Sequence, residues 1–463
     1  TSKGSESTGV MPFVKVVDSE MLAFSQGVTR RGSYAAYLHM SHPEVEEFLD
    51  MRKPTGGDTN RKCLNLHHGV VIPDKFMEII HKATKEPGFD DSWELIDPHS
   101  GEVKKVVSAR TLWVKLLQNR METGEPYLMF EDAVNADLPQ FQKNKGLRVH
   151  HSNLCSEITL ATDEERTAVC CLSSVNLEYY DEWKKVPAFI PDLIRMLDNV
   201  LESFIKNAPE QLERAKFSAM RERSLGLGAM GFHAYLQKSG ISFESPLASA
   251  INYEMFNSIK SQAQTTTEQL AVERGACPDD DSCSVRNTHL LAIAPNASSS
   301  IICGNTSPSI EPFRANAYTQ KTKSGSYLQK NKFLEEVLEK YNQNTENTWK
   351  SIVTNKGSVQ HLEFLSEEEK EVFKTAVEIN QSWVIEHAAQ RQEFICQSQS
   401  VNLFFPPDVN KGELHNIHML AWAKNMKTLY YLRSEAISRA DNVSNKIKRE
   451  IIFEQQDCLS CEG

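Results

Sequence analysis

The chain has 463 residues, of which 40% are hydrophobic and 24% are charged. These proportions exclude a disordered, a collagen-like and a small disulfide-stapled protein, and the length allows a large core. Lys and Arg number 51 against 62 Asp and Glu, which gives a formal net charge of −11, so direct DNA binding and attachment to an anionic membrane are not expected.

No long apolar segment is present, and the first residues are polar. The sequence therefore predicts neither a secretory signal nor a membrane span. Its 10 cysteines are scattered along the chain instead of densely spaced. Reduced thiols in a cytoplasmic protein are the expectation.

Strands and helices are expected to alternate along most of the chain. The predicted strands cover residues 34–38, 69–73, 127–130, 168–177 and 289–294, and the predicted helices cover 42–50, 74–80, 110–117, 192–205, 225–236 and 247–271. Asp74 is a candidate N-cap for the helix that follows it. Because the apolar runs are of the buried type, we expect an α/β architecture with mostly parallel strand pairing.

The carboxy-terminal part differs in composition from the rest. Residues 427–432 form the last expected core element, and the polar, charged segment 433–463 is predicted to be a flexible tail. Segment 324–375 carries apolar residues at helical spacing, namely Leu334, Val337 and Leu338, and is predicted to form a small helical excursion. With no internal repeat, residues 1–432 are expected to form one continuous body.

The motif Asn153-Leu154-Cys155-Ser156-Glu157 places an amide, a thiol and a carboxylate at alternate positions. On an extended segment, residues two apart point to the same side, so Asn153, Cys155 and Glu157 would enter one pocket. Together they could supply a hydrogen-bonding amide, a sulfur reactant and an acid or base. The competing interpretation is a buried packing cysteine between two surface polar residues.

Two further motifs lie in expected core segments. Cys170 and Cys171 are adjacent on a predicted strand, so they point to opposite faces and only one of them can share a pocket with Cys155. Tyr430-Tyr431 is an aromatic pair that could fill the core or carry an electron and a proton. For both motifs, simple packing is the alternative interpretation.

The segment from Pro295 to Ser300 follows a predicted strand and is rich in serine. Its hydroxyl and backbone N–H groups could hold a phosphate, particularly if a helix begins there. It is not a Walker loop, because no Gly-Lys-Ser or Gly-Lys-Thr is present, and a serine-rich turn without a ligand is an equal alternative.

Cys458 and Cys461 form a Cys-Xaa-Xaa-Cys pair on the expected tail. Two thiols at this spacing can form a small disulfide ring or half a zinc site. No second nearby pair of ligands completes a zinc site, so no metal is expected and a redox shuttle is favoured.

Taken together and in this order, these motifs resemble the catalytic large subunit of an aerobic, class I ribonucleotide reductase. The resemblance spans nearly the whole chain and includes further segments at 5–13, 25–34, 223–228, 273–278, 308–312 and 429–431. It implies a ten-stranded α/β barrel of the family's large-subunit type, incomplete at its amino-terminal side, with the Cys155 segment as a loop inside it.

The resemblance also implies roles for the reactive residues. Cys155 would become the thiyl radical that removes the ribose 3′ hydrogen, Glu157 would take the 3′-hydroxyl proton and Asn153 would hydrogen-bond the substrate. Cys170 would be one half of a buried dithiol that is regenerated by the tail dithiol of Cys458 and Cys461. Tyr430 and Tyr431 would relay the radical to the active cysteine.

Binding roles follow from the same resemblance. The implied substrate-binding residues are Ser7, Thr8, Pro295, Asn296, Ala297, Ser298 and Ser299. The implied loop that transmits effector identity to substrate choice contains Ser25, Gln26, Gly27, Arg30 and Arg31. ATP and deoxynucleoside triphosphates would be the effectors.

The resemblance further implies partners. The enzyme would reduce ribonucleoside diphosphates to deoxyribonucleotides with a radical from a metal-containing small subunit, with no cofactor bound covalently to this chain. Thioredoxin or glutaredoxin would supply the electrons.

The family's amino-terminal helical region, first effector-binding loop and partner of Cys170 do not precede Thr1. We therefore expect the carboxy-terminal part of a split or truncated large subunit, inactive alone and completed by an amino-terminal large-subunit fragment. The alternative is a non-catalytic nucleotide- or subunit-binding remnant of the same fold.

Overall fold

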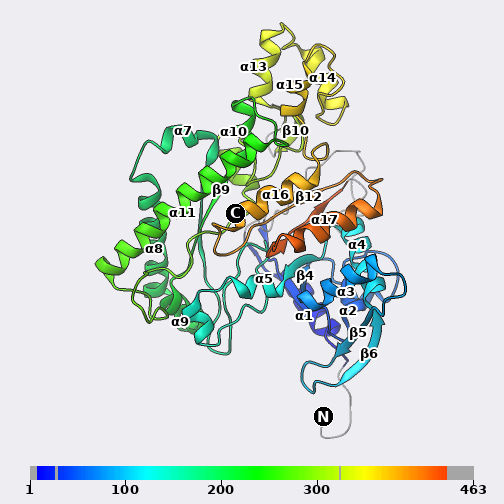
Figure 1. Ribbon diagram of the computed structural model, residues 1–463, viewed down its shortest axis with the longest axis vertical. Helices are drawn as coiled ribbons and strands as arrows, with labels where there is room; N and C mark the ends of the chain where they lie inside the picture. The colour runs from blue at the N-terminus through cyan, green and yellow to red at the C-terminus, as the bar shows by residue number, and fades with distance from the viewer. Residues whose placement is uncertain (1–7, 27–29, 323–324, 435–463) are drawn as a thin grey trace.

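The computed structural model describes residues 8–26, 30–322 and 325–434. Strands β1 (Ser25–Gln26) and β2 (Arg30–Arg31) pair antiparallel and are described by their backbone only. In Figure 1 the amino-terminal part lies at the bottom right, the long helices of the middle part at the left, and a helical lobe at the top. No helix in the described ranges is long and apolar enough to cross a membrane.

A four-stranded sheet forms the centre of the amino-terminal part. In spatial order its strands are β13 (Thr428–Leu429), β7 (Tyr127–Phe130), β4 (His67–Ile72) and β3 (Ala35–His39). β3, β4 and β7 run parallel, as expected, whereas β13 runs antiparallel to β7. This pairing brings a carboxy-terminal segment into the amino-terminal sheet.

Helices and one hairpin surround this sheet. They are α1 (Met11–Ala23), α2 (Val45–Leu49), α3 (Asp74–Lys85), α4 (Ala109–Thr123), α5 (Glu131–Ala136), α6 (Gln140–Asn144) and the hairpin of β5 (Ser92–Ile96) and β6 (Val103–Ser108). Ser108 caps α4 by accepting from the Thr111 N–H. Asp74 is not the cap of α3: Pro73 holds that position, and the Asp74 carboxylate instead accepts from the Trp422 ring N–H at 2.8 Å.

The middle part is built on the parallel pair of β8 (Cys171–Asn176) and β9 (Leu225–Met230). Figure 1 shows long helices beside this pair. The helices of this part are α7 (Tyr180–Trp183), α8 (Phe189–Asn207), α9 (Glu213–Glu222), α10 (Phe232–Lys238) and α11 (Pro246–Arg274).

The predicted helix over residues 225–236 is wrong in its first half. Residues 225–230 are the buried strand β9, and the helix begins only after Gly231, which has a φ of 83°. A Cβ at Gly228 would lie 2.5 Å from the carbonyl oxygen of Ala292. The glycine therefore permits a close approach of two backbones, which the sequence pattern does not reveal.

The predicted strand at 289–294 is extended but irregular. It makes only the isolated bridges Leu227↔Leu291 and Ile293↔Gln399. The N–H groups of Leu290 and Leu291 donate to the sulfur of Cys396, at 3.0 and 3.2 Å, instead of to a neighbouring strand. This sulfur contact interrupts the ladder.

The ten-stranded barrel is not present as one closed sheet in the described residues. Backbone hydrogen bonds do connect both sheets through extended segments, in the order β4, β7, 427–433, 397–405, 289–293, β9 and β8. Within this series β12 (Leu403–Phe404) pairs parallel with β14 (Leu432–Arg433). The series stays open because no strand pairing in the described ranges joins β8 to β3.

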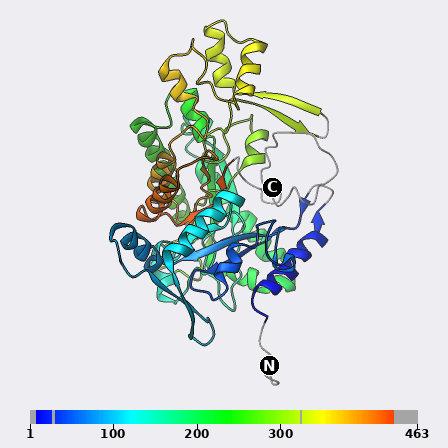
Figure 2. The same cartoon turned by 90° about the vertical axis from the view of Figure 1, so that its right-hand side faces the viewer.

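The top lobe in Figures 1 and 2 contains short helices above a hairpin. These elements are β10 (Ala317–Thr322), β11 (Gly325–Lys330), α13 (Lys332–Lys340), α14 (Glu346–Thr354) and α15 (Glu367–Val372). The helical spacing noted in the sequence falls in α13, where Leu334 and Leu338 are buried. The lobe has a hydrophobic cluster of its own around Trp349 and Ile352.

Three helices complete the fold, namely α12 (Ala297–Ile302), α16 (Gln381–Gln392) and α17 (Lys411–Ala423). The last two pack against each other. α17 also contacts α3, so it links the carboxy-terminal part to the helices of the amino-terminal part.

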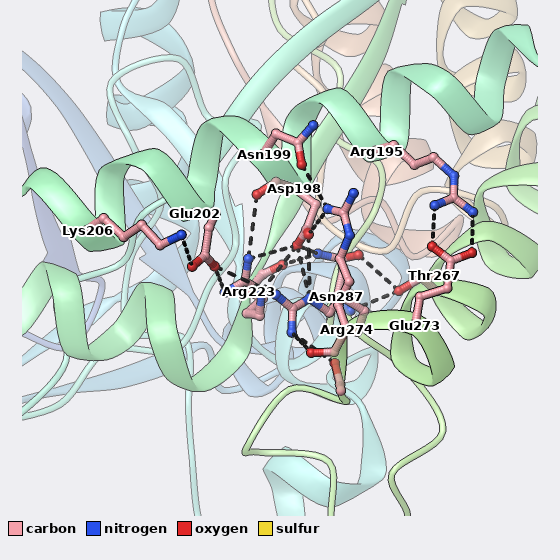
Figure 3. A network of polar contacts seen from close by, with 12 residues as sticks. Arg195, Asp198, Asn199, Glu202, Lys206, Arg223, Thr267, Glu273, Arg274 and Asn287 are labelled. Carbon is pink, nitrogen blue, oxygen red and sulfur yellow. Dashed lines mark hydrogen bonds and ion pairs between the residues drawn. The ribbon is translucent and has the colours of Figure 1, made fainter.

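A buried carboxylate ties the elements of the middle part together (Figure 3). Asp198 of α8 is fully buried and accepts from Arg223 at 2.9 Å, which follows α9, and from Arg274 at 2.8 Å, which ends α11. Arg286 lies 3.4 Å from the same carboxylate. Burial alone would raise the pKa of Asp198, but the charges of Arg223 and Arg286 outweigh it and hold that pKa below its ordinary value.

Asp198→Asn is expected to lower the free energy of unfolding by about 3 kcal/mol, because removing one partner leaves buried guanidinium groups uncompensated. Urea unfolding at pH 7 measures this loss. Asp192→Asn, at an exposed position on the same helix, is the control and should cost less than about 1 kcal/mol. Equal losses in the two variants would contradict the role given to Asp198.

Candidate active site

The segment that carries Asn153, Cys155 and Glu157 is a turn and not the extended segment that was considered for it, whereas the resemblance implies a loop here. The turn lies at Leu154 and Cys155, and Ser156 has a φ of 66°, which is a left-handed conformation. Alternation along a strand therefore does not bring these side chains together. The turn does so instead, because the amide of Asn153 hydrogen-bonds Glu157 and also accepts from the Ile158 N–H at 3.2 Å.

Four backbone carbonyl groups of this turn accept hydrogen bonds from neighbouring strands and extended segments. The Tyr37 hydroxyl donates to the Asn153 carbonyl at 2.9 Å, and the Ser400 hydroxyl donates to that of Cys155 at 2.6 Å. The carbonyls of Ser156 and Glu157 accept from the Thr428 hydroxyl at 2.8 Å and the Ser398 N–H at 2.9 Å. The turn is thus held both by the four-stranded sheet, through Tyr37 and Thr428, and by the extended segment 397–405.

Glu157 lies in a dry environment and is 2% exposed. Burial raises the pKa of its carboxyl to about 7, against smaller opposing effects of hydrogen bonds from Asn153 and Ser400. A carboxyl with a pKa near 7 can exchange a proton in either direction at neutral pH. Glu157 is therefore suited to act as a general base.

Cys155 is 6% exposed and lies in a cluster with three tyrosines, Tyr127, Tyr430 and Tyr431. The ring centroids of Tyr430 and Tyr431 are 4.3 Å apart, and that of Tyr127 lies 4.7 Å from Tyr430. These contacts form a continuous series of aromatic rings that leads to the thiol. The structure therefore brings Cys155 and the tyrosine pair together.

Cys170 directly precedes β8. The side-chain amide of Gln397 donates to its sulfur at 3.2 Å, and burial raises the pKa of the thiol well above its ordinary value. The charge of Glu157 contributes to the same shift, which places Cys170 within electrostatic reach of Glu157. Cys171 begins the β8 ladder opposite Leu225.

The serine-rich segment does begin a helix, as the sequence suggested. α12 starts at Ala297, directly after Asn296 in a left-handed conformation with a φ of 56°. Asn296 does not cap the helix, because its amide hydrogen-bonds Ser174 of β8. The first N–H groups of a helix have no partners within it and can receive an anion.

A cavity of about 60 Å³ lies beside α12. Its lining includes Pro295 and Ala297, and its charged side chains are four cations and one carboxylate, namely Arg314, Lys330, Lys332, Arg433 and Glu311. This surrounding charge favours an anionic group at the helix start.

Several predicted site residues are placed elsewhere or are not described. Thr8 is exposed, and its carbonyl accepts from Arg61 at 3.4 Å. The predicted residues Ser7, Gly27, Cys458 and Cys461 lie outside the described residues. The side chains of Ser25, Gln26, Arg30 and Arg31 are likewise not described. In the described ranges, no group of three or more His, Cys, Asp or Glu could hold a metal ion.

Sequence reasoning missed the residues that hold the site in place. Tyr37, Gln397, Ser398, Ser400 and Thr428 all contact the reactive segments, and they are far from residues 153–157 in the chain. The run Gln397-Ser398-Gln399-Ser400 is entirely buried although it is polar. A run of polar residues between predicted core elements is the sequence signal that could have indicated this buried polar segment.

Comparisons with known proteins give a consistent result. A family model described as "Ribonucleotide reductase, barrel domain" matches residues 1–282 and 278–432. The large subunit of ribonucleoside-diphosphate reductase from Invertebrate iridescent virus 3 is 45% identical over 99% of this chain and 80% of its own length. The corresponding subunit from Invertebrate iridescent virus 6 is 30% identical over 95% of this chain and 81% of its own length.

A solved structure is also similar, that of the class Id ribonucleotide reductase alpha subunit of Actinobacillus ureae. The two chains are 37% identical and align with a TM-score of 0.81. The match covers 95% of this chain and 77% of the other.

The raised pKa of Glu157 predicts a pH-dependent stability. Its neutral form is favoured in the fold, so the contribution to stability is complete below the unfolded value of about 4.3 and is lost as the pH rises through about 7. Glu157→Gln should therefore have a higher free energy of unfolding than the parent chain at pH 8, but not at pH 4. Urea unfolding across this range measures the difference.

Glu164→Gln is the matched control, because Glu164 is exposed and lies nearby in the chain. It should change stability little at either pH. If Glu157→Gln followed the parent chain at every pH, Glu157 would not be the neutral buried carboxyl described above.

Proposed function

Because the chain belongs to the ribonucleotide reductase large-subunit family, we propose that it reduces ribonucleoside diphosphates to deoxyribonucleotides as a class I enzyme. The observation that carries this proposal is the burial of Cys155 between an aromatic series and a carboxyl with a pKa near 7. A radical that abstracts hydrogen must be buried, since water and oxygen would quench it. A carboxyl with a pKa near 7 is needed because the reaction of a ribose diol requires a group that accepts a hydroxyl proton.

In this proposal Cys155 carries the thiyl radical and removes the 3′ hydrogen atom of the ribose. Glu157 accepts the proton of the 3′-hydroxyl, and Asn153 hydrogen-bonds the substrate. The 2′-hydroxyl leaves as water, and two thiols supply two electrons and become a disulfide. Cys170 is one of these thiols, and its raised pKa keeps it protonated until it reacts.

The radical originates in a metal-containing small subunit and reaches Cys155 through Tyr431 and then Tyr430. The ring contact of 4.3 Å between the two tyrosines supports a direct transfer between them. Neither tyrosine needs to move for this step, because both are buried and lie in one cluster with Cys155.

The substrate diphosphate binds at the start of α12, through Pro295 to Ser299. The cationic cavity at that point supports this assignment. In this proposal Ser7 and Thr8 bind the substrate, and the loop with Ser25, Gln26, Gly27, Arg30 and Arg31 transmits effector identity to substrate choice, as the sequence resemblance implies. Cys458 and Cys461 pass electrons from thioredoxin or glutaredoxin to the Cys170 dithiol.

Cys155→Ser should abolish turnover and leave the affinity for a ribonucleoside diphosphate within about threefold, because sulfur supplies the radical and little ground-state binding. The assay combines the chain with its small subunit, with and without an amino-terminal large-subunit polypeptide. Activity with the small subunit alone would rule out the expected need for that polypeptide.

Cys277→Ser is the matched control for this test. Cys277 is also buried, but its sulfur lies 3.4 Å from the Thr288 hydroxyl, a polar contact that serine can keep. It should retain turnover. Substantial activity in Cys155→Ser would show that the radical assignment is wrong.

Replacing both Cys458 and Cys461 by serine should abolish repeated turnover with thioredoxin but spare a single turnover of the prereduced complex. A small dithiol should restore part of the activity, because it can reach the buried pair directly. The exposed cysteines Cys283 and Cys303, replaced together by serine, are the control. Equal loss under all three conditions would indicate a structural or metal-binding role for the tail pair.

A further inference from the structure

The side chain of Gln397 contacts the thiol of Cys170 and is completely buried. Its Nε2 lies 3.2 Å from the Cys170 sulfur and 2.9 Å from the carbonyl oxygen of Leu225, the first residue of β9. Its Oε1 lies 3.3 Å from the backbone nitrogen of Thr159, which follows the turn that carries Glu157. One amide therefore joins three segments of the candidate site.

The surroundings allow only one orientation of this amide. The Thr159 N–H can only donate, so the atom that faces it is the oxygen, and the Leu225 carbonyl can only accept, so the atom that faces it is the nitrogen. The second hydrogen of the NH₂ group is then available for the sulfur of Cys170. Because the sulfur accepts this hydrogen bond, the thiol hydrogen of Cys170 points elsewhere.

The backbone around Gln397 is held in place as well. Its carbonyl accepts from the buried ammonium group of Lys427 at 2.6 Å. The next residue, Ser398, donates its N–H to the carbonyl of Glu157 at 2.9 Å. Cys170 and Glu157 are therefore attached to two consecutive residues of one fixed segment.

We propose that Gln397 is a positioning residue for Cys170, which holds the sulfur in place and stabilises its thiolate when the thiol reacts. The role of Cys170 as a reducing thiol rests on the proposed function, whereas the contact with Gln397 does not. A hydrogen bond to an ionised group is stronger than one to a neutral group, so the amide favours the thiolate over the thiol.

The other groups around this thiol act in the opposite direction. Burial raises the pKa of Cys170, and so do the charges of three groups from three segments, whereas the hydrogen bond from Gln397 lowers it. These groups are Cys171 of β8, Glu157 of the turn and Glu222 at the end of α9. The amide thus assists the ionisation of a thiol that its surroundings otherwise keep neutral.

The reaction in which this thiol takes part is balanced in atoms and electrons. Cys170 and a second thiol lose two protons and two electrons, their two S–H bonds break, and one S–S bond forms. The bond between C2′ and its hydroxyl breaks, and the hydroxyl leaves as water with one of the protons. C2′ receives the other proton together with the two electrons. Gln397 neither gives nor takes a proton.

The test measures how fast iodoacetamide alkylates Cys170 in the full chain without substrate, in the parent and in Gln397→Met. Methionine has a similar size but no N–H for the sulfur, and Cys170 is partly exposed, so a small reagent can reach it. The chain is mixed for seconds into buffers from pH 7 to pH 11, and tandem mass spectrometry separates the products at Cys170 and Cys171. Because the thiolate is the nucleophile, the rate follows its fraction at each pH.

We expect alkylation of Cys170 at pH 8 to be about threefold slower in Gln397→Met, with the midpoint of its pH profile about one unit higher. One unit lowers the thiolate fraction about tenfold, and the greater nucleophilicity of a more basic thiolate returns about threefold. The rate at Cys171 should stay unchanged. An equal change at Cys170 and Cys171 would show a general loosening and overturn the positioning role.

Gln399→Met is the matched control, because Gln399 belongs to the same buried polar run and its amide donates to the Ala388 carbonyl at 2.8 Å. Its rate at Cys170 should equal that of the parent. Gln397→Glu carries the test if Gln397→Met fails to fold, which far-UV circular dichroism reports. Glutamate keeps the size and an oxygen for Thr159 but lacks the NH₂ group, so it should also slow the alkylation.

The failures of the two proposals are distinguishable. Equal rates and equal midpoints at Cys170 in the parent and in Gln397→Met would overturn the role of Gln397 and leave the proposed function standing. Full turnover of Cys170→Ser in the complex with the small subunit and the amino-terminal polypeptide would overturn the reducing role of Cys170, and with it the use of the stabilised thiolate in the reaction.

Discussion

The attachment of one turn to both the four-stranded sheet and the extended segment 397–405 is the constraint on which the site depends. The carbonyls of residues 153, 155, 156 and 157 each accept a hydrogen bond from outside the turn, and three of the four donors are side-chain hydroxyls. A buried carbonyl left without a donor is costly, so these bonds define a single position for the turn. Cys155 and Glu157 are thus placed by hydrogen bonds to their backbone carbonyls.

Burial shifts the pKa of most titratable groups around this turn for the same electrostatic reason. It favours the uncharged forms of Glu157, Cys170 and Tyr37, whose pKa values are all raised. Glu125 is the exception, since the effects of Arg52 and His67 outweigh its burial. The turn is thus surrounded by groups whose pKa values are raised, whereas the carboxylate beside His67 is ionised.

Sequence reasoning succeeded where the determining pattern is local. The helix expected over 247–271 is α11, because its apolar spacing and the preceding Ser-Pro pair are readable in the chain itself. The strand β9 was predicted as a helix, because the reason for Gly228 is a contact with Ala292, far along the sequence. The motif around Cys155 was recognised in the same local way. Tyr37 and Ser400, which hydrogen-bond the carbonyls of this motif, were not recognised, since neither lies in a sequence pattern that points to residues 153–157.

The tyrosine pair lies between β13 and β14, which belong to different sheets: β13 pairs with β7, and β14 pairs with β12. The Thr428↔Met129 pairing closes a loop that contains more than half of the described chain, and such closure is entropically expensive until the intervening elements have formed. We therefore expect this junction to assemble late in folding. A partly folded chain would therefore lack the contact between the tyrosine pair and Cys155, so the candidate site is complete only when the whole fold has formed.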